Sequence, residues 1–274
     1  MPKSSTKATA FIRDKIRGRI YATRRLFKMG RLPNALIIGT MKGGTTSLFE
    51  YLGQHPNVCT CVMKEPQYFD SQYNRGVDWY RSWFWPKREH KVVIEASPHI
   101  LFHPLAPRRV HEVVPSAKLI VALREPVARA YSHYRHWIDL GYETLSFREA
   151  LDREASRTAD LEARLLRGEK IDWLPLRNYS YVGHGRYATQ IERWLSYFPR
   201  DQMLFLKSEE MFDSPRTALD RICRFLGLPK FAFSDLNPHN QRQYSGLEPK
   251  LQARLASEFA ASNDALECLT GIRW

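Results

Sequence analysis

Six consecutive residues near the start of the chain combine a positive charge, paired glycines and three hydroxyl groups. They follow the short apolar run Ala35–Ile38, which is typical of a buried strand, and lead into a helical pattern. A loop between a strand and a helix N-terminus directs several backbone N–H groups, and the positive end of the helix dipole, at one point. The sequence therefore predicts a phosphate-binding loop at these residues: Lys42, Gly43, Gly44, Thr45, Thr46 and Ser47.

The order of these residues differs from that of the common nucleoside-triphosphate loop. In that loop the lysine stands directly before a magnesium-binding hydroxyl, whereas Lys42 stands before both glycines. We also find no second aspartate at the end of an apolar run to hold magnesium. A nucleotide kinase or triphosphatase is thus the alternative enzyme prediction, and a glycine-rich turn without a ligand is the structural one.

An arginine and a serine could bind a second anionic group. Arg124 directly follows the apolar run Lys118–Leu123, and Pro126 then suits the first turn of a helix that carries Ser132. Guanidinium and hydroxyl groups together suit a phosphate. An arginine at a strand end is common, so this prediction gains its weight from the phosphate-binding loop.

Glu65 is the candidate general base. Pro66 is expected to hold Glu65 in an extended backbone conformation, so that its carboxylate projects from a loop beside the phosphate-binding loop. The alternative is an exposed glutamate that pairs with a nearby lysine. Glu95 and Ser97, at the end of another apolar run, are expected near the same site, with a salt bridge as the alternative role of Glu95.

Apolar runs that alternate with helical patterns predict an α/β fold. The predicted fold is P-loop-like and has three layers, in which helices flank a central, mainly parallel sheet. The predicted strands are Ala35–Ile38, Val58–Val62, Val92–Glu95, Lys118–Leu123 and Met203–Leu206. One helix is predicted to begin at Ser47. Further helices are predicted over Val77–Trp85, Leu105–Val114, Phe147–Arg167, Arg186–Phe198, Arg216–Leu226 and Pro249–Ala261. The aromatic stretch Trp173–Tyr181, which contains Arg177, is expected to be irregular, either part of an acceptor cleft or a plain surface loop.

The composition indicates an anionic partner. The 274 residues carry a formal net charge of +13, which suits nucleic acid, a membrane surface or anionic small molecules. A nucleic-acid-binding protein would need a basic face with stacking aromatics and a recognised module, and we find none in the sequence. Nucleic acid is therefore not an expected partner.

The cysteines and the apolar runs indicate the compartment. The four cysteines lack paired C-x-x-C spacing, which argues against a zinc site or a disulfide framework and favours a reducing compartment. No apolar run approaches the roughly 18 residues of a spanning helix, and the N-terminus lacks the core of a signal peptide. We therefore expect a cytoplasmic protein. The basic arm 1–33 could lie on a membrane as an amphipathic helix, or be a helix packed on the domain or an arm without fixed structure.

The motifs together resemble the sulfotransferase family, whose members use 3′-phosphoadenosine 5′-phosphosulfate (PAPS), and in particular the heparan-sulfate-type carbohydrate sulfotransferases and their bacterial relatives. The resemblance covers about residues 34–274, which implies a single domain. It rests on Gly39–Ser47 with Leu52 and His55–Pro56, Lys64–Pro66, Arg124–Ser132, Asp78–Tyr80, Gly185–Tyr187, Gln190–Trp194, Leu204–Phe212 and Asn263–Trp274.

The resemblance implies a role for each candidate residue. The loop Lys42–Ser47 matches the residues around the 5′-phosphosulfate, Arg124 and Ser132 match those that hold the 3′-phosphate, and Glu65 matches the catalytic base. Arg242 falls in a segment that matches a basic loop closing over the donor. One departure concerns the acceptor, since Ala96 stands where heparan-type members usually carry a lysine.

The implied reaction is in-line transfer of a sulfuryl group from PAPS to an acceptor hydroxyl, in preference to an amine. Lys42 would neutralise the charge on the leaving phosphate oxygen, and Glu65 would accept the proton of the acceptor. No metal is needed on this account, because Lys42 and Arg124 neutralise a single phosphate leaving group. The expected acceptor is a carbohydrate or glycolipid, with peripheral membrane contact through the N-terminal arm.

Overall fold

Five parallel strands form the centre of the protein in a computed structural model, which describes residues 23, 26–27, 29–238 and 246–274. The strand order is β2-β3-β1-β4-β5, and each neighbouring pair is parallel. The predicted parallel sheet is confirmed. The strands are β1 (Ala35–Gly39), β2 (Val58–Thr60), β3 (Val92–Ala96), β4 (Lys118–Leu123) and β5 (Met203–Lys207).

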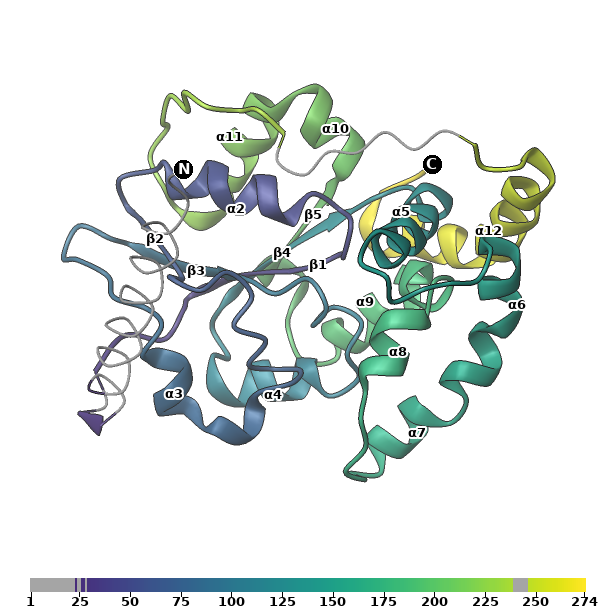
Figure 1. The fold of residues 1–274 in the computed structure, drawn as a ribbon. Coiled ribbons are helices and arrows are strands. Elements are labelled where there is room, and N and C mark those ends of the chain that lie inside the picture. The colour runs from purple at the N-terminus through teal and green to yellow at the C-terminus, as the bar shows by residue number, and fades with distance from the viewer. Residues whose placement is uncertain (1–22, 24–25, 28, 239–245) are drawn as a thin grey trace, which may run out of the picture.

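Helices cover both faces of this sheet (Figure 1). In the view of Figure 1, α2, α10 and α11 lie above the sheet, α3 and α4 lie below it, and α5 to α8 gather with α12 beyond one end. The helices are α2 (Thr45–Gly53), α3 (Val77–Arg81), α4 (Ala106–Val113), α5 (Pro126–Asp139), α6 (Phe147–Thr158), α7 (Leu161–Leu166), α8 (Leu174–Tyr179), α9 (Tyr187–Leu195), α10 (Ser208–Asp213), α11 (Pro215–Leu226) and α12 (Pro249–Thr270). Single 3₁₀ turns occur at Tyr73–Arg75, Gly183–Gly185 and Arg200–Gln202.

Several predicted boundaries differ from the structure. The helix predicted over Phe147–Arg167 is two helices, because Asp160 adopts a left-handed φ of 58° between α6 and α7. The stretch Trp173–Tyr181 is not irregular but contains α8, whose first turn accommodates Pro175. The last helix continues past Ala261 to Thr270. Most of the basic arm 1–33, and with it the predicted amphipathic helix, lies outside the described residues, as does Arg242.

The strand order changes direction between β1 and β4, where a crevice for a ligand is expected. Strands β1 and β4 are neighbours, but the chain continues from them in opposite directions across the sheet. After β1 it runs to β2 at one edge, and after β4 it runs to β5 at the other edge. Connections that diverge from adjacent parallel strands leave room for a ligand at the carboxyl ends of those strands. The two predicted anion-binding segments follow these two strands.

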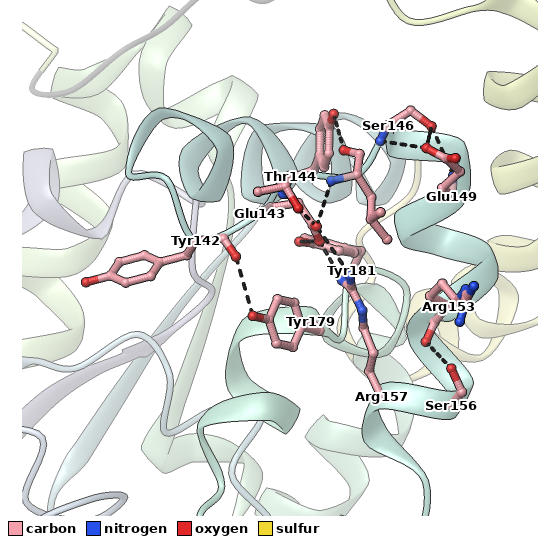
Figure 2. A network of polar contacts seen from close by, with 12 residues as sticks. Tyr142, Glu143, Thr144, Ser146, Glu149, Arg153, Ser156, Arg157, Tyr179 and Tyr181 are labelled. Atoms are coloured by element: carbon pink, nitrogen blue, oxygen red, sulfur yellow. Dashed lines mark hydrogen bonds and ion pairs between the residues drawn. The ribbon is translucent and has the colours of Figure 1, made fainter.

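A buried carboxylate fastens the region beyond the sheet (Figure 2). The side chain of Glu143 is 1% exposed and accepts hydrogen bonds from Arg157 Nη1 at 2.6 Å and from the Tyr181 hydroxyl at 2.8 Å. It also accepts the backbone N–H groups of Thr144 and Leu145. Burial alone would raise the pKa of Glu143, but these hydrogen bonds together lower it. The carboxylate thereby joins the end of α5, helix α6 and the segment after α8.

Where the structure is described, no helix is both long and apolar enough to cross a bilayer. The four cysteines are free thiols, three of them buried and Cys268 exposed. Within the same described ranges no group of histidine, cysteine, aspartate and glutamate side chains could hold a metal ion.

The Glu143 network predicts a pH-dependent contribution to stability. Glu143→Gln keeps the size of the side chain and removes its charge, so we expect the free energy of unfolding at neutral pH to fall by about 1–3 kcal/mol. The pKa of Glu143 is lower in the folded protein than the ordinary value of 4.5, so this advantage of the wild type is present above that pH and is lost as pH falls through the folded pKa. Urea unfolding at a series of pH values measures it.

The matched control is Glu112→Gln. Glu112 also accepts a bond from a tyrosine, at 2.9 Å from the Tyr73 hydroxyl, and faces Arg108, but its side chain is 49% exposed. We expect a change below about 1 kcal/mol for this surface group. Equal losses in the two variants, or a Glu143→Gln loss that persists undiminished in acid, would contradict the interpretation.

Candidate active site

The loop after β1 is fixed by the ends of its neighbours. Thr40 N donates to Ala122 O of β4 at 2.8 Å, and Gly43 N donates back to Thr40 O at 2.9 Å. The hydroxyl of Ser208, the first residue of α10, donates to Gly43 O at 2.8 Å in a buried contact. Lys42 adopts a left-handed φ of 69° within this turn. The loop is therefore held by the sheet and α10 together.

Both glycines of the loop are required by packing within the protein. A Cβ atom on Gly43 would lie 2.3 Å from Ala122 O, which is a backbone atom and cannot swing away. A Cβ atom on Gly44 would lie 2.6 Å from side-chain atoms of Met211 and Phe212, and Gly44 has a φ of 87°. The sequence predicted both glycines as part of a phosphate-binding loop. The structure shows that they also allow β4 and α10 to pack closely against this loop.

Among the described residues, no side chain caps the N-terminus of α2. Gly44 caps this helix without a side-chain hydrogen bond, and the first turn contains no acidic residue. Its backbone N–H groups and positive dipole end are therefore available to an anion. The polar side chains of the loop differ in burial. Ser47 is fully buried against Tyr51 and Thr45 is 5% exposed, whereas Thr46 and Lys42 are half-buried. The last two are the members that a ligand reaches first.

Arg124 lies beside the phosphate-binding loop. It directly follows β4, and its Nη1 donates to Lys42 O at 3.5 Å. The predicted proximity of the two anion-binding segments is thereby observed. Ser132 lies on α5 and is 2% exposed. In contrast to α2, the N-terminus of α5 is already capped, because the Glu125 carboxylate accepts Val127 N and Ala128 N.

Two backbone contacts that the sequence did not predict fix Arg124. The Tyr187 hydroxyl donates to Arg124 O at 2.8 Å. Glu209 of α10 accepts Glu125 N at 2.9 Å and, through its other oxygen, Trp274 Nε1 at 3.2 Å. The last residue of the chain thus supports the turn that carries Arg124. The only sequence signal was membership of these residues in the motifs of the family resemblance.

Glu65 lies in a loop, but its backbone is not extended as predicted. Its φ is 60°, in the left-handed region, so the surrounding loop overrides the extended preference of a residue before proline. Its side chain is 29% exposed and its Oε1 lies 2.5 Å from Lys64 Nζ. The lysine pair considered as the alternative is therefore present. It leaves Glu65 as an accessible carboxylate.

Two further carboxyl groups lie near Glu65, and both are buried. Burial raises the pKa of Glu95, on β3, to about 8, and the charges of Asp70 and Glu65 add to this effect. Burial also raises the pKa of Asp70 to about 6. The Ser97 hydroxyl donates to Glu95 at 3.3 Å, and no basic side chain forms an ion pair with Glu95 in the described ranges. The salt-bridge alternative for Glu95 is therefore wrong there, and Glu65 is the most exposed of the three carboxyl groups.

Two buried histidines lie close together at α5: His133 belongs to this helix, and His184 belongs to the 3₁₀ turn Gly183–Gly185. Burial lowers the pKa of His133 and His184 well below the ordinary range, and their rings lie 5.2 Å apart. Arg129 is fully buried beside them, with Nη1 at 3.4 Å from His133 Nδ1 and Nη2 donating to Tyr181 O. These histidines are neutral at physiological pH and support α5 rather than carry charge to the crevice.

A cavity among the described residues lies away from these groups. Its volume is about 780 Å³, and residues of α6, α7, α9 and α12 form most of its wall. None of the predicted site residues lines it. Position at the strand ends, rather than cavity size, identifies the candidate site.

Comparison with known proteins gives one consistent family. A model of the sulfotransferase domain matches residues 32–244. Human heparan sulfate glucosamine 3-O-sulfotransferase 6 is 35% identical over 200 residues, which cover 73% of this chain and 54% of that protein. The bifunctional heparan sulfate N-deacetylase/N-sulfotransferase 1 of Caenorhabditis briggsae is 30% identical over 262 residues, 86% of this chain and 30% of that protein. The chain spans about half the length, or less, of these curated relatives.

Solved structures agree with the sequence comparison. A sulfotransferase from Alicyclobacillus acidocaldarius is 32% identical, with a TM-score of 0.73 over 89% of this chain and 98% of that one. The mouse sulfotransferase SULT7A1, solved with PAP, is 16% identical with a TM-score of 0.55 over 88% of this chain and 89% of that one, which shows a common fold.

The close packing of the loop predicts that Gly43→Ala is destabilising. The added methyl group meets Ala122 O at 2.3 Å, so the loop or β4 must shift, and we expect a loss of about 1–3 kcal/mol in the free energy of unfolding. Gly53→Ala is the matched control. There the new Cβ lies 3.3 Å from a Thr60 methyl group, and alanine favours the helix. Urea unfolding of both variants measures the difference, and equal stabilities would contradict the packing role of Gly43.

Proposed function

The chain belongs to the sulfotransferase family, and on that premise we propose that it transfers a sulfuryl group from PAPS to a hydroxyl of a carbohydrate or glycolipid acceptor. The observation that carries the proposal is the contact of Arg124 Nη1 with the backbone carbonyl of Lys42, which brings together the loops that follow β4 and β1. Two cationic residues and a helix N-terminus on neighbouring loops suit a nucleotide with phosphate groups at both ends of its ribose. The family assignment argues against the kinase-like and nucleic-acid-binding alternatives.

The residues present fit the donor. The N-terminus of α2, with no acidic residue in its first turn, would hold the 5′-phosphosulfate together with Lys42, Gly43, Gly44, Thr45, Thr46 and Ser47. Arg124 donates only one long hydrogen bond within the described ranges, so its other N–H groups are available to the 3′-phosphate. Ser132, on the helix α5 that follows, is proposed for the same phosphate. Arg242 is proposed for the same donor from the family resemblance. When bound, the donor supplies the activated sulfuryl group.

Positioning and charge are the contributions of the protein to the chemistry. Lys42 and the N–H groups at the start of α2 stabilise negative charge on the leaving phosphate oxygen. Glu65 accepts the proton of the attacking hydroxyl, because its side chain is 29% exposed while Glu95 and Asp70 are buried. No metal is required, since Lys42 and Arg124 neutralise the phosphates.

The acceptor is proposed from the relatives, whose names include heparan sulfate glucosamine. Ala96 stands where the heparan-type resemblance has a lysine, and it is fully buried in β3. Acceptor contacts at this chain must therefore come from other side chains. The cytoplasmic location and the membrane contact of the basic arm stay predictions.

Glu65→Gln tests the assignment of the base. We expect turnover to fall about 10²- to 10⁴-fold, the contribution of one general base, with donor affinity unchanged. The assay measures PAPS-dependent sulfation of an N-sulfated heparosan octasaccharide. Glu89→Gln, which removes another lysine-paired glutamate 54% exposed on the surface, is the matched control. Turnover of Glu65→Gln equal to that of the control would remove Glu65 from the mechanism.

A further inference from the structure

Arg177 is held between two tryptophan rings at the side of the candidate site. It lies on α8, and its guanidinium carbon is 5.9 Å from the ring centre of Trp173 and 6.0 Å from that of Trp137 on α5. Both indoles are only 6% exposed. Cation–π contacts of this kind restrain an arginine without using its hydrogen-bond donors. The orientation of Arg177 is therefore set before any ligand arrives.

Most of the donors of this guanidinium are unused. Nε donates to Asn178 Oδ1 at 3.0 Å, and the two Nη groups donate no hydrogen bond to any residue that the structure describes. Burial lowers the pKa of Arg177, but an arginine remains charged at neutral pH. The result is a partly desolvated cation with two open amino groups.

The start of α8 is tied to the loop that carries Glu65. Trp173 Nε1 donates to Ser71 Oγ at 3.0 Å, and Ser71 N donates to Asp70 Oδ1 at 2.6 Å. The charges of Asp70 and Glu65 both act on Arg177, while neither forms an ion pair with it in the described part of the chain. Asp172 is the third acid that acts on it. Through the Trp173–Ser71 contact, Arg177 is therefore held next to the loop that carries Glu65, and neither acid of that loop pairs directly with it in the described ranges.

We infer that Arg177 binds an anionic oxygen group of the acceptor, a carboxylate or a sulfate, next to the hydroxyl that Glu65 deprotonates. The inference rests on the proposed function, because the hydroxyl must lie within hydrogen-bond reach of Glu65. The planar fork of arginine matches either anion with two parallel hydrogen bonds. A neutral acceptor would leave the restrained guanidinium without a partner, so Arg177 selects for acidic acceptors.

The alternative is that Arg177 only moderates the buried charge of Asp70. Asp70 Oδ2 is buried and has no hydrogen-bond partner among the described residues. In that case removal of Arg177 would change stability and leave acceptor affinity alone. The two roles therefore differ in a binding measurement.

The test is calorimetric titration of the full chain, saturated with 3′-phosphoadenosine 5′-phosphate, with two probes. One is an N-sulfated heparosan octasaccharide, and the other is its N-acetylated, carboxyl-reduced, neutral counterpart. We expect Arg177→Met to weaken binding of the anionic probe at least about 10-fold, as for the loss of one charge-assisted hydrogen bond, without weakening binding of the neutral one. Arg177→Lys should retain part of the affinity as a point charge.

Arg216→Met is the control for net charge, since it removes an exposed arginine from the start of α11. Equal losses in the two Met variants, an unchanged affinity in Arg177→Met, or a wild type that binds both probes equally would overturn the inference. Unchanged nucleotide affinity and thermal unfolding in Arg177→Met show that the variant is folded, and Arg177→Lys serves if it is not. A wild type that binds the anionic probe through Arg177 but binds no nucleotide would refute the proposed donor and leave the role of Arg177 intact.

Discussion

The parallel pairing of β1 with β4 is the constraint on which the rest of the structure depends. It places the two loops that follow these strands at one edge, where Thr40 N bonds Ala122 O at 2.8 Å and Arg124 reaches Lys42 O. The chain then diverges to opposite sides of the sheet, which opens the crevice. Gly43 is required because the loop after β1 approaches Ala122 O of β4 so closely. The proposed anion binding thus depends on the same arrangement as the strand pairing.

Burial sorts the carboxyl groups of the site into different roles. The pKa of Glu95 is raised to about 8 and that of Asp70 to about 6, so the first stays protonated at neutral pH and the second titrates just below it. Glu65 is the partly exposed member and is paired with Lys64. Because Glu95 is protonated at neutral pH, the three neighbouring acids do not all carry a negative charge, and the repulsion among them is reduced. Their different depths, rather than their sequence, single out the proposed base.

The sequence predicted what depends on local pattern. Apolar runs located all five strands, and the order of lysine, glycines and hydroxyl residues located the loop before α2. It failed where tertiary contacts override local preference, as at the left-handed Glu65 and at Asp160, where no glycine or proline signals the end of α6. The support of Arg124 by Glu209 and Trp274 joins residues far apart in the chain, so no spacing rule could reveal it. The sequence also predicted an irregular segment at Trp173–Tyr181, whereas this stretch contains α8.

The most direct test of the account is calorimetric titration of the wild type and of Arg124→Ala with 3′-phosphoadenosine 5′-phosphate and with ATP, each with and without magnesium. The account predicts that the bisphosphate binds more tightly than ATP, without need of the metal, and that Arg124→Ala weakens it about 10- to 100-fold. Arg108→Ala, at an arginine 57% exposed on α4, should bind as the wild type does. Preference for ATP with magnesium, or equal binding by Arg124→Ala, would contradict the assignment of the crevice.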